Sequence, residues 1–248
     1  MKAFVFAAGK GTRLKPWTDN HPKALAEVNG MSMLERVIQG ISERSSVDSF
    51  IVNVHHFANQ IIDHISDSKF LKNKIIDISD ETSELLETGG ALLKAKNLIE
   101  DEDIILVHNS DILTDFDYQS IISEHKKQGN DITLLVNDRD SSRKLLFGSN
   151  MLLEGWKNFK TGEEIKISGS NPENIFSFAG IHIISTTILE YLETYSKEHK
   201  THSFGLIPFY LWSMDKIKIR GYKHPSAYRW IDIGKPEALE ISKTLFRE

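Results

Sequence analysis

Residues 4–25 read F-V-F-A-A-G-K-G-T-R-L-K-P-W-T-D-N-H-P-K-A-L, an apolar run that gives way at once to small and basic residues. This change is typical of a buried strand that opens into a glycine-rich loop. Gly9 and Gly11 lack a Cβ, so the backbone can adopt positive φ there and turn several N–H groups toward one anion. The segment favours a phosphate-binding loop, although an ordinary strand-to-helix turn with solvated bases has the same short Gly-Lys-Gly pattern.

Two common phosphate-binding motifs do not fit this segment. In a P-loop the first glycine stands further from the Gly-Lys-Ser/Thr end than Gly9 stands from Gly11-Thr12. In the dinucleotide fingerprint G-x-G-x-x-G, a third glycine would occupy the position of Leu14. The spacing therefore excludes both motifs.

The segment resembles the signature of the sugar-1-phosphate nucleotidylyltransferases, which is A-A-G-x-G-T-R-L, then Pro, then Pro-Lys-x-Leu. Further matches are Glu87-Thr88-Gly89-Gly90, Asn109-Ser110-Asp111, Phe178-Ala179-Gly180-Ile181 and Trp230-Ile231-Asp232-Ile233-Gly234. Ser110 stands where the family has glycine, which puts the backbone geometry of that turn in doubt. Within the family the chain is most similar to the N-acetylmuramate-1-phosphate uridylyltransferase branch, with the mannose-1-phosphate guanylyltransferases as near neighbours.

The resemblance implies a role for each matching residue. Arg13 and Lys23 are the expected catalytic cations, with Lys23 neutralising charge that develops between the two substrates. The expected nucleotide-binding residues are Ala7, Ala8, Gly9, Lys10, Gly11, Thr12, Arg13, Asn53, Leu85, Gly89 and Asn109. The expected sugar-phosphate-binding residues are Glu87, Thr88, Asn137, Lys144 and Gly180.

Asp111 directly follows a buried-looking strand, where a carboxylate is either a helix cap or a metal ligand. Spacing alone does not identify a partner, because Asp232 lies far away in the sequence. The resemblance joins these two residues as the carboxylates that hold one Mg²⁺, with phosphates and water supplying the other oxygens. We therefore expect Mg²⁺ as the cofactor.

The order of apolar segments predicts an α/β fold. Strand-like runs at residues 2–7, 49–54, 74–78, 104–108 and 131–136 alternate with segments of helical spacing, which favours a parallel sheet covered on both faces. Shorter segments at 143–147, 151–156, 164–167 and 176–184 predict a mixed or antiparallel lid over the sugar, and helices are expected at 187–195, 204–212 and 237–246. The resemblance implies the same architecture, the nucleotide-diphospho-sugar transferase fold with its Rossmann-like, mainly parallel mixed sheet. We expect one domain over residues 1–248, with 1–140 as the nucleotide-binding core and 141–248 as the sugar-binding part and closing metal-ligand segment.

The composition is that of a compact enzyme. The 248 residues include 40% hydrophobic ones, and the formal net charge of −5 argues against a nucleic-acid partner. There is no cysteine, so neither a disulfide framework nor a thiolate metal site is possible. No signal peptide and no run of membrane-spanning length is recognised, which leads us to expect a cytoplasmic protein with no membrane partner.

The resemblance implies Mg²⁺-dependent transfer of a nucleotidyl group from an NTP to a sugar-1-phosphate, giving an NDP-sugar and pyrophosphate. The NTP is expected to be UTP or GTP, and the protein a monomer or homodimer. Mannose-1-phosphate guanylyl transfer is the alternative within the family, and a non-catalytic NDP-sugar-binding regulatory subunit is the alternative of another class. The presence of Arg13, Lys23, Asp111 and Asp232 favours the enzyme, because a sensor would not require them.

Two further segments have structural interpretations. The run R-D-S-S-R at residues 139–143 is expected to be a solvated turn rather than an anion site. If Gly89-Gly90 does not bind a ligand, it is expected to be a turn before a helix.

Overall fold

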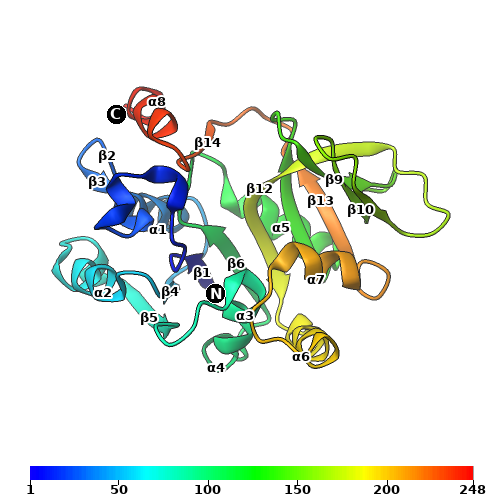
Figure 1. Cartoon of the computed structure of the whole chain (residues 1–248), viewed down its shortest axis with the longest axis horizontal. Coiled ribbons are helices and arrows are strands. Elements are labelled where there is room, and N and C mark those ends of the chain that lie inside the picture. The colour runs from blue at the N-terminus through cyan, green and yellow to red at the C-terminus, as the bar shows by residue number, and fades with distance from the viewer. Residues whose placement is uncertain (248) are drawn as a thin grey trace.

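The computed structural model describes residues 1–247 (Figure 1). Its main sheet contains β1 (Lys2–Phe6), β4 (Ser49–Val54), β5 (Ile75–Asp80), β6 (Ile104–Asn109), β8 (Ile132–Asn137), β9 (Arg143–Phe147), β10 (Leu153–Asn158), β11 (Glu164–Lys166), β12 (Asn174–Ser185) and β13 (Ile219–Lys223). Two short pairs accompany it, β2 (Glu27–Val28) with β3 (Met31–Ser32) and β7 (Ile112–Thr114) with β14 (Trp230–Asp232).

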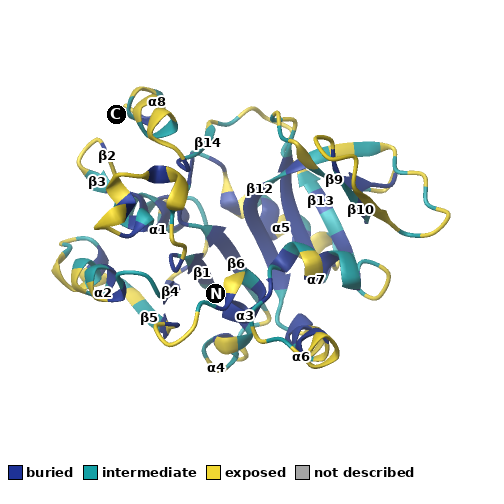
Figure 2. Cartoon of the chain, viewed as in Figure 1, coloured by how far each residue is buried: buried dark blue, intermediate teal, exposed yellow. Residues whose placement is uncertain are grey.

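Helices cover both faces of this sheet. They are α1 (Met33–Glu43), α2 (Ala58–Asp67), α3 (Glu87–Lys94), α4 (Lys96–Ile99), α5 (Tyr118–Gln128), α6 (Ile188–His199), α7 (Leu206–Ser213) and α8 (Pro236–Leu245). One apolar core joins the sheet to α1, α2 and α5, and a second joins it to α3, α4, α6 and α7. Figure 2 shows the buried central strands between helices that expose their outer faces. Within residues 1–247 no helix is both long and apolar enough to cross a membrane.

The expected parallel sheet is confirmed for its first half. Strands β5, β4, β1 and β6 lie next to one another in that order and are all parallel. Their carboxyl ends therefore meet at one edge, where ligands bind in such sheets. Strand β12 then pairs antiparallel with β6 and β8, and β8 pairs parallel with β13.

The lid differs from the expectation in one respect. Strands β9, β10 and β11 form the antiparallel lid that the short segments predicted. However, β12 does not belong to the lid alone, because its first part pairs with β9 while its second part lies in the central sheet. A register shift between Phe178 and His182 and the positive φ of Gly180, 78°, separate the two parts. A local irregularity thus lets one strand serve both layers.

The Gly89-Gly90 pair is also placed differently from the expectation. Both glycines lie inside the first turn of α3 rather than in a turn before it. A Cβ on Gly89 would lie 2.4 Å from a ring carbon of Phe204, and one on Gly90 would lie 2.1 Å from the His202 carbonyl oxygen. Close packing of α3 against residues 202–204 therefore requires these glycines.

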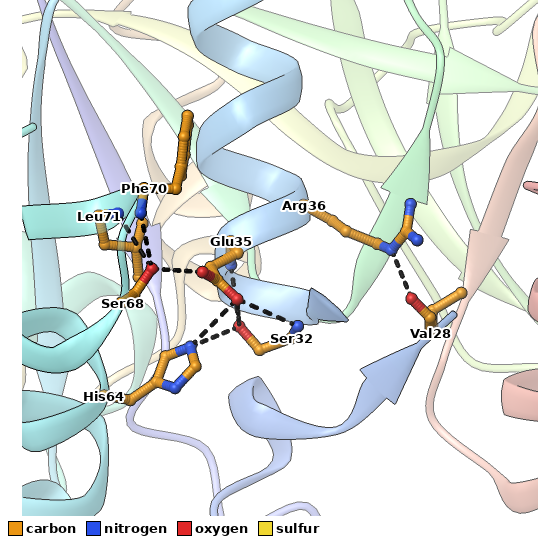
Figure 3. A network of polar contacts seen from close by, with 8 residues as sticks. All are labelled: Val28, Ser32, Glu35, Arg36, His64, Ser68, Phe70 and Leu71. Atoms are coloured by element: carbon orange, nitrogen blue, oxygen red, sulfur yellow. Dashed lines mark hydrogen bonds and ion pairs between the residues drawn. The ribbon is translucent and has the colours of Figure 1, made fainter. Parts of the chain in front are cut away.

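Helix α1 begins at a network that also holds α2 (Figure 3). Ser32 and Glu35 form a reciprocal capping box, which satisfies N–H groups that have no partner within the helix. The Ser32 hydroxyl lies 2.8 Å from His64 Nε2 of α2, and the Ser68 hydroxyl donates to Glu35. These contacts fix the two helices that follow the first two parallel strands.

A buried histidine on β12 is expected to make the stability of the fold depend on pH. His182 is 1% exposed, and neither of its ring nitrogens has a hydrogen-bond partner. Burial lowers the pKa of His182 to about 3. In the unfolded chain the imidazole titrates near 6.5, so below that pH the unfolded chain takes up a proton that the folded chain excludes. Above pH ~6.5 His182 therefore does not lower the free energy of unfolding. As the pH drops from ~6.5 toward ~3, protonation of the unfolded chain lowers that free energy progressively.

We expect His182→Leu to reduce this acid sensitivity. Between pH 7 and 4.5 the variant should lose about 2 kcal/mol less unfolding free energy than the parent chain, measured by urea denaturation at each pH. His202→Leu, at an exposed position, should show the parent's dependence. Equal pH dependence of the parent and His182→Leu would contradict the assignment.

Candidate active site

A cavity of about 340 Å³ opens at the carboxyl ends of β1, β4 and β6. Ten of the residues predicted from the sequence line it: Ala7, Ala8, Gly9, Lys23, Asn53, Leu85, Glu87, Thr88, Asn109 and Asp111. Phe6, Glu81 and Ser110 complete the lining. The glycine-rich loop thus lies at the same edge as the strand that ends before Asp111.

Asp111 and Asp232 lie side by side, as the resemblance implied. Strands β7 and β14 pair antiparallel, with Asp232 opposite Ile112, and the Ile233 N–H donates to the Asp111 carbonyl at 2.8 Å. Asp111 lies in the turn between β6 and β7, so it is not a helix cap. The pairing of two short strands therefore joins the sequence-distant carboxylates.

Two basic side chains contact these carboxylates. The Lys23 ammonium donates to Asp111 Oδ2 and lies 3.9 Å from Asp232 Oδ1. Arg13 Nη2 lies 3.8 Å from Asp232 Oδ2. Only 12% of the Lys23 side chain is exposed, so it is not the solvated surface lysine that an isolated lysine would usually be. The structure brings all four expected catalytic and metal-binding residues into one cluster.

Asp232 has the most perturbed environment in this cluster. Burial raises the pKa of its carboxyl, the charge of Asp111 raises it further, and Lys23, Arg13 and Arg139 oppose the rise. Its Oδ1 atom is buried and makes no hydrogen bond within residues 1–247. A cation bound there would satisfy this oxygen and relieve the repulsion between the two carboxylates.

The donor set limits the kinds of cation that these residues would suit. Within residues 1–247 no group of three or more acidic or histidine side chains could hold a metal ion. Two carboxylates without imidazole or thiolate suit a hard cation that takes its remaining oxygens from water and substrate phosphates, as Mg²⁺ does. Asp111 and Asp232 therefore fit a nucleotide-associated Mg²⁺ and do not fit a structural zinc site.

Gly234 makes the close approach of these groups possible. A Cβ at this position would lie 2.8 Å from both Arg13 Nη2 and Asp232 Oδ1. The glycine in the W-x-D-I-G segment thus leaves room for the guanidinium beside the carboxylate.

A buried network positions the glycine-rich loop. The Ala7 N–H donates to Asn53 Oδ1 at 2.7 Å, and Asn53 Nδ2 donates to Glu81 Oε1 at 2.7 Å. Glu81 is completely buried, and burial raises the pKa of its carboxyl. Glu81 is not recognisable from the sequence, because a carboxylate in the polar run S-D-E-T-S-E resembles an exposed one.

The turn at Ser110 tolerates a side chain. Among residues 1–247 the positive-φ residues other than glycine are Asn29, Phe57, Glu87, Met151 and Lys200, and Ser110 is not one of them. Its N–H donates to the Phe6 carbonyl at 3.1 Å. The doubt about the backbone geometry is thereby removed, because this turn does not require glycine.

Several predicted residues lie outside the cavity lining. Lys10, Gly11, Thr12 and Arg13 form the outer part of the loop. The Gly89 N–H donates to the Phe204 carbonyl at 2.7 Å, which leaves it no free donor for a nucleotide. Gly180 lies beside the cavity, since a Cβ there would be 3.1 Å from Asn109 Nδ2.

Asn137 and Lys144 line two other cavities. Asn137 borders one of about 300 Å³ with Tyr228 and Trp230, and Lys144 borders one of about 720 Å³ beside the lid. Neither residue lines the cavity that the glycine loop borders.

Arg139 is not in a solvated turn, contrary to the expectation for residues 139–143. Its Nη2 donates to the Phe178 carbonyl at 3.1 Å, and its guanidinium lies 4.7 Å from the centre of the Trp230 ring. Its Nε is buried and has no hydrogen-bond partner within residues 1–247. Burial lowers the pKa of Arg139, and the charge of Asp232 opposes this. We therefore add Arg139 to the site.

Gly11 supports Lys23 directly. Its φ is +60°, and a Cβ would lie 2.9 Å from Lys23 Cβ and 2.9 Å from Thr18 Cγ2. A side chain there would strain the backbone and displace the lysine.

We expect Gly11→Val to weaken apparent NTP affinity by about 10-fold or more, because positive φ costs a β-branched residue at least 1–2 kcal/mol. Titration of the chain with NTP, followed by calorimetry, would measure this. Gly129→Val is a matched control, since Gly129 has φ +57° at the end of α5 with open space around it. Unchanged affinity in Gly11→Val would remove the loop from the site.

Comparison with known proteins agrees with this geometry. The model of the nucleotidyl transferase family matches residues 2–246. The chain belongs to this family. The bifunctional protein GlmU of Methanococcus aeolicus is 32% identical over 240 residues, covering 95% of this chain and 52% of that protein. The N-acetylmuramate alpha-1-phosphate uridylyltransferase of Caulobacter vibrioides is 40% identical over 111 residues, covering 44% of this chain and 45% of that protein.

The matched part of the chain spans about half the length of each of these curated relatives. Among solved structures, HddC from Yersinia pseudotuberculosis has a TM-score of 0.76 at 23% identity and covers 99% of both chains. This likeness shows a shared fold over nearly all of the chain.

Proposed function

We propose that this chain is a Mg²⁺-dependent enzyme that transfers a nucleotidyl group from an NTP to a sugar-1-phosphate. The observation that carries the proposal is the cluster of Lys23, Asp111, Asp232 and Arg13 beside a glycine-rich loop. A non-catalytic NDP-sugar sensor would not require a buried lysine between two carboxylates. The position of the cluster at the carboxyl edge of a parallel sheet also suits a nucleotide site.

The reaction is a direct transfer that needs no covalent enzyme intermediate. A phosphate oxygen of the sugar-1-phosphate attacks the α-phosphorus of the NTP, and a new P–O bond forms. The bond to the β-phosphate oxygen breaks, and pyrophosphate leaves with the electron pair. Both phosphate groups enter ionised, so the protein's task is positioning and charge neutralisation.

Different groups of the site would contribute to this positioning and charge neutralisation. The N–H groups of residues 8–11, together with Arg13, would hold the phosphates that leave. Lys23 would neutralise charge on the oxygens between the two substrates, because its ammonium already lies where phosphates would meet the carboxylates. Asp111 and Asp232 would hold Mg²⁺, which supplies Lewis-acid charge neutralisation when bound.

The proposal also names the base of the NTP and the sugar that accepts the nucleotidyl group. UTP and N-acetylmuramate 1-phosphate are the favoured substrates, supported by the 40% identity to the Caulobacter uridylyltransferase. That match includes 44% of this chain.

A substrate panel tests the proposal. The purified chain is supplied with Mg²⁺ and with UTP or GTP, each paired with N-acetylmuramate 1-phosphate or mannose 1-phosphate. Pyrophosphate release is expected with UTP and N-acetylmuramate 1-phosphate. Release only with GTP and mannose 1-phosphate would move the chain to the guanylyltransferase branch. Absence of release with every pair would overturn the enzymatic proposal.

A further inference from the structure

A second cavity, of about 720 Å³, lies between the lid and helices α6 and α7. Phe178 of β12 and Trp156 of the lid form part of one wall, and Ile207, Leu211 and Trp212 of α7 form part of the other. Figure 1 places the lid strands β9 and β10 at the far end of the molecule from α1 and α2. Aromatic and aliphatic walls of this size suit a ring-shaped ligand.

The charged residues that line this cavity are mainly basic. Arg139, Arg143 and Lys144 border it, and Glu163 is the one acidic residue in its lining within residues 1–247. Cross-strand pairing places Leu145 opposite Trp156, and Trp156 opposite Ile165. Because side chains alternate along a strand, Arg143 shares the face of Leu145 and Trp156.

The guanidinium of Arg143 is unpaired within the described residues. Its backbone bonds with Ser141, but its guanidinium makes no hydrogen bond and no ion pair within residues 1–247. By contrast, Lys157 on the neighbouring strand lies 3.7 Å from Glu164. The guanidinium of Arg143 is thus available to an anion.

Arg139 connects this cavity with the metal-binding carboxylates. It lines the cavity and donates to the Phe178 carbonyl, and its guanidinium lies 4.7 Å from the ring of Trp230, on the strand that also carries Asp232. A sugar bound in this cavity would have Arg139 near its 1-phosphate and the lid near a distant substituent.

We propose that the Arg143 guanidinium binds a carboxylate on the sugar. This cavity would thereby select an acidic hexosamine 1-phosphate over its neutral counterpart. The inference rests on the proposed transfer to a sugar-1-phosphate. A guanidinium presents a planar fork that matches a carboxylate with two parallel hydrogen bonds. A neutral sugar would stack against the same apolar walls and would leave this donor unused.

Paired substrates test the assignment. N-acetylmuramate 1-phosphate and N-acetylglucosamine 1-phosphate differ by the lactyl ether that carries the carboxylate. With UTP and Mg²⁺, the parent chain should show a higher kcat/KM for the acidic sugar. Arg143→Gln should lower that value about 10-fold, the scale for one charge-assisted contact at a partly exposed site, and leave turnover of the neutral sugar within about 2-fold. Arg143→Lys should retain part of the preference.

The control is Lys157→Gln, which removes one positive charge from the same lid outside the cavity lining. Thermal unfolding of each variant checks that the lid is intact. Equal use of both sugars by the parent chain, or the same loss in Arg143→Gln and Lys157→Gln, would overturn the role of Arg143 and leave the transfer reaction standing. Absence of turnover with both sugars in the parent chain would overturn the proposed function itself.

Discussion

Lys23→Ala is expected to lower turnover by about 10²–10³-fold, the scale for losing one positioned electrostatic group at developing charge. In the structure the ammonium contacts Asp111 and lies 3.9 Å from Asp232, and the cavity reaches it. Steady-state pyrophosphate release would measure the loss in kcat. Folding should survive, because Lys23 is not part of the apolar core and because Asp111 and Asp232 are both partly exposed to solvent.

Lys15→Ala is the matched control for this substitution. Lys15 lies in the same segment but is exposed and pairs with Asp19 at 2.8 Å. Its removal should leave kcat within about 2-fold, as is usual for an exposed ion pair. Near-normal turnover in Lys23→Ala would remove Lys23 from the reaction and leave it a structural partner of Asp111.

Asp111→Asn and Asp232→Asn should each lower activity by roughly 10²-fold or more, since the charge stabilisation from a bound metal is worth several kcal/mol. Because both carboxylates serve one ion, the double variant should be scarcely worse than the worse single variant. Raising the Mg²⁺ concentration should partly restore the single variants if weakened binding is their defect.

Independent roles would give a different pattern. The losses would then multiply in the double variant, and Mg²⁺ would not restore either single variant. Asp138→Asn serves as the control, because Asp138 is an exposed carboxylate that contacts Lys223. A loss in this control similar to that of the single variants would show that the effect is not specific to the pair.

The parallel half of the sheet was predictable because its strands are short, apolar-rich runs that alternate with segments of helical spacing. Residues 49–54 form β4 as expected, and all six are buried. The placement of β12 was not predictable from periodicity. Its run is largely apolar on both sides of Gly180, and the division between lid and central sheet depends on the backbone at that glycine.

The site residues that belong to short sequence motifs were predictable. Those that reach the site only through tertiary contacts were not. Lys23 and Asp111 belong to short segments with a recognisable signature. Their contact with Asp232 depends on the pairing of β7 with β14, strands too short to recognise by pattern. Glu81 and Arg139 were missed because each stands in a polar run, and only the packing of distant elements buries them.

The most direct test of the central claim is transfer of the α-phosphate itself. The chain is incubated with Mg²⁺, UTP labelled at the α-phosphorus and N-acetylmuramate 1-phosphate, and the label is followed by chromatography. We predict that the label appears in a UDP-sugar with an equal amount of pyrophosphate, and that Lys23→Ala abolishes most of this transfer. Label that remains entirely in UTP, while the chain binds a UDP-sugar without forming one, would contradict the account and identify a binding protein instead.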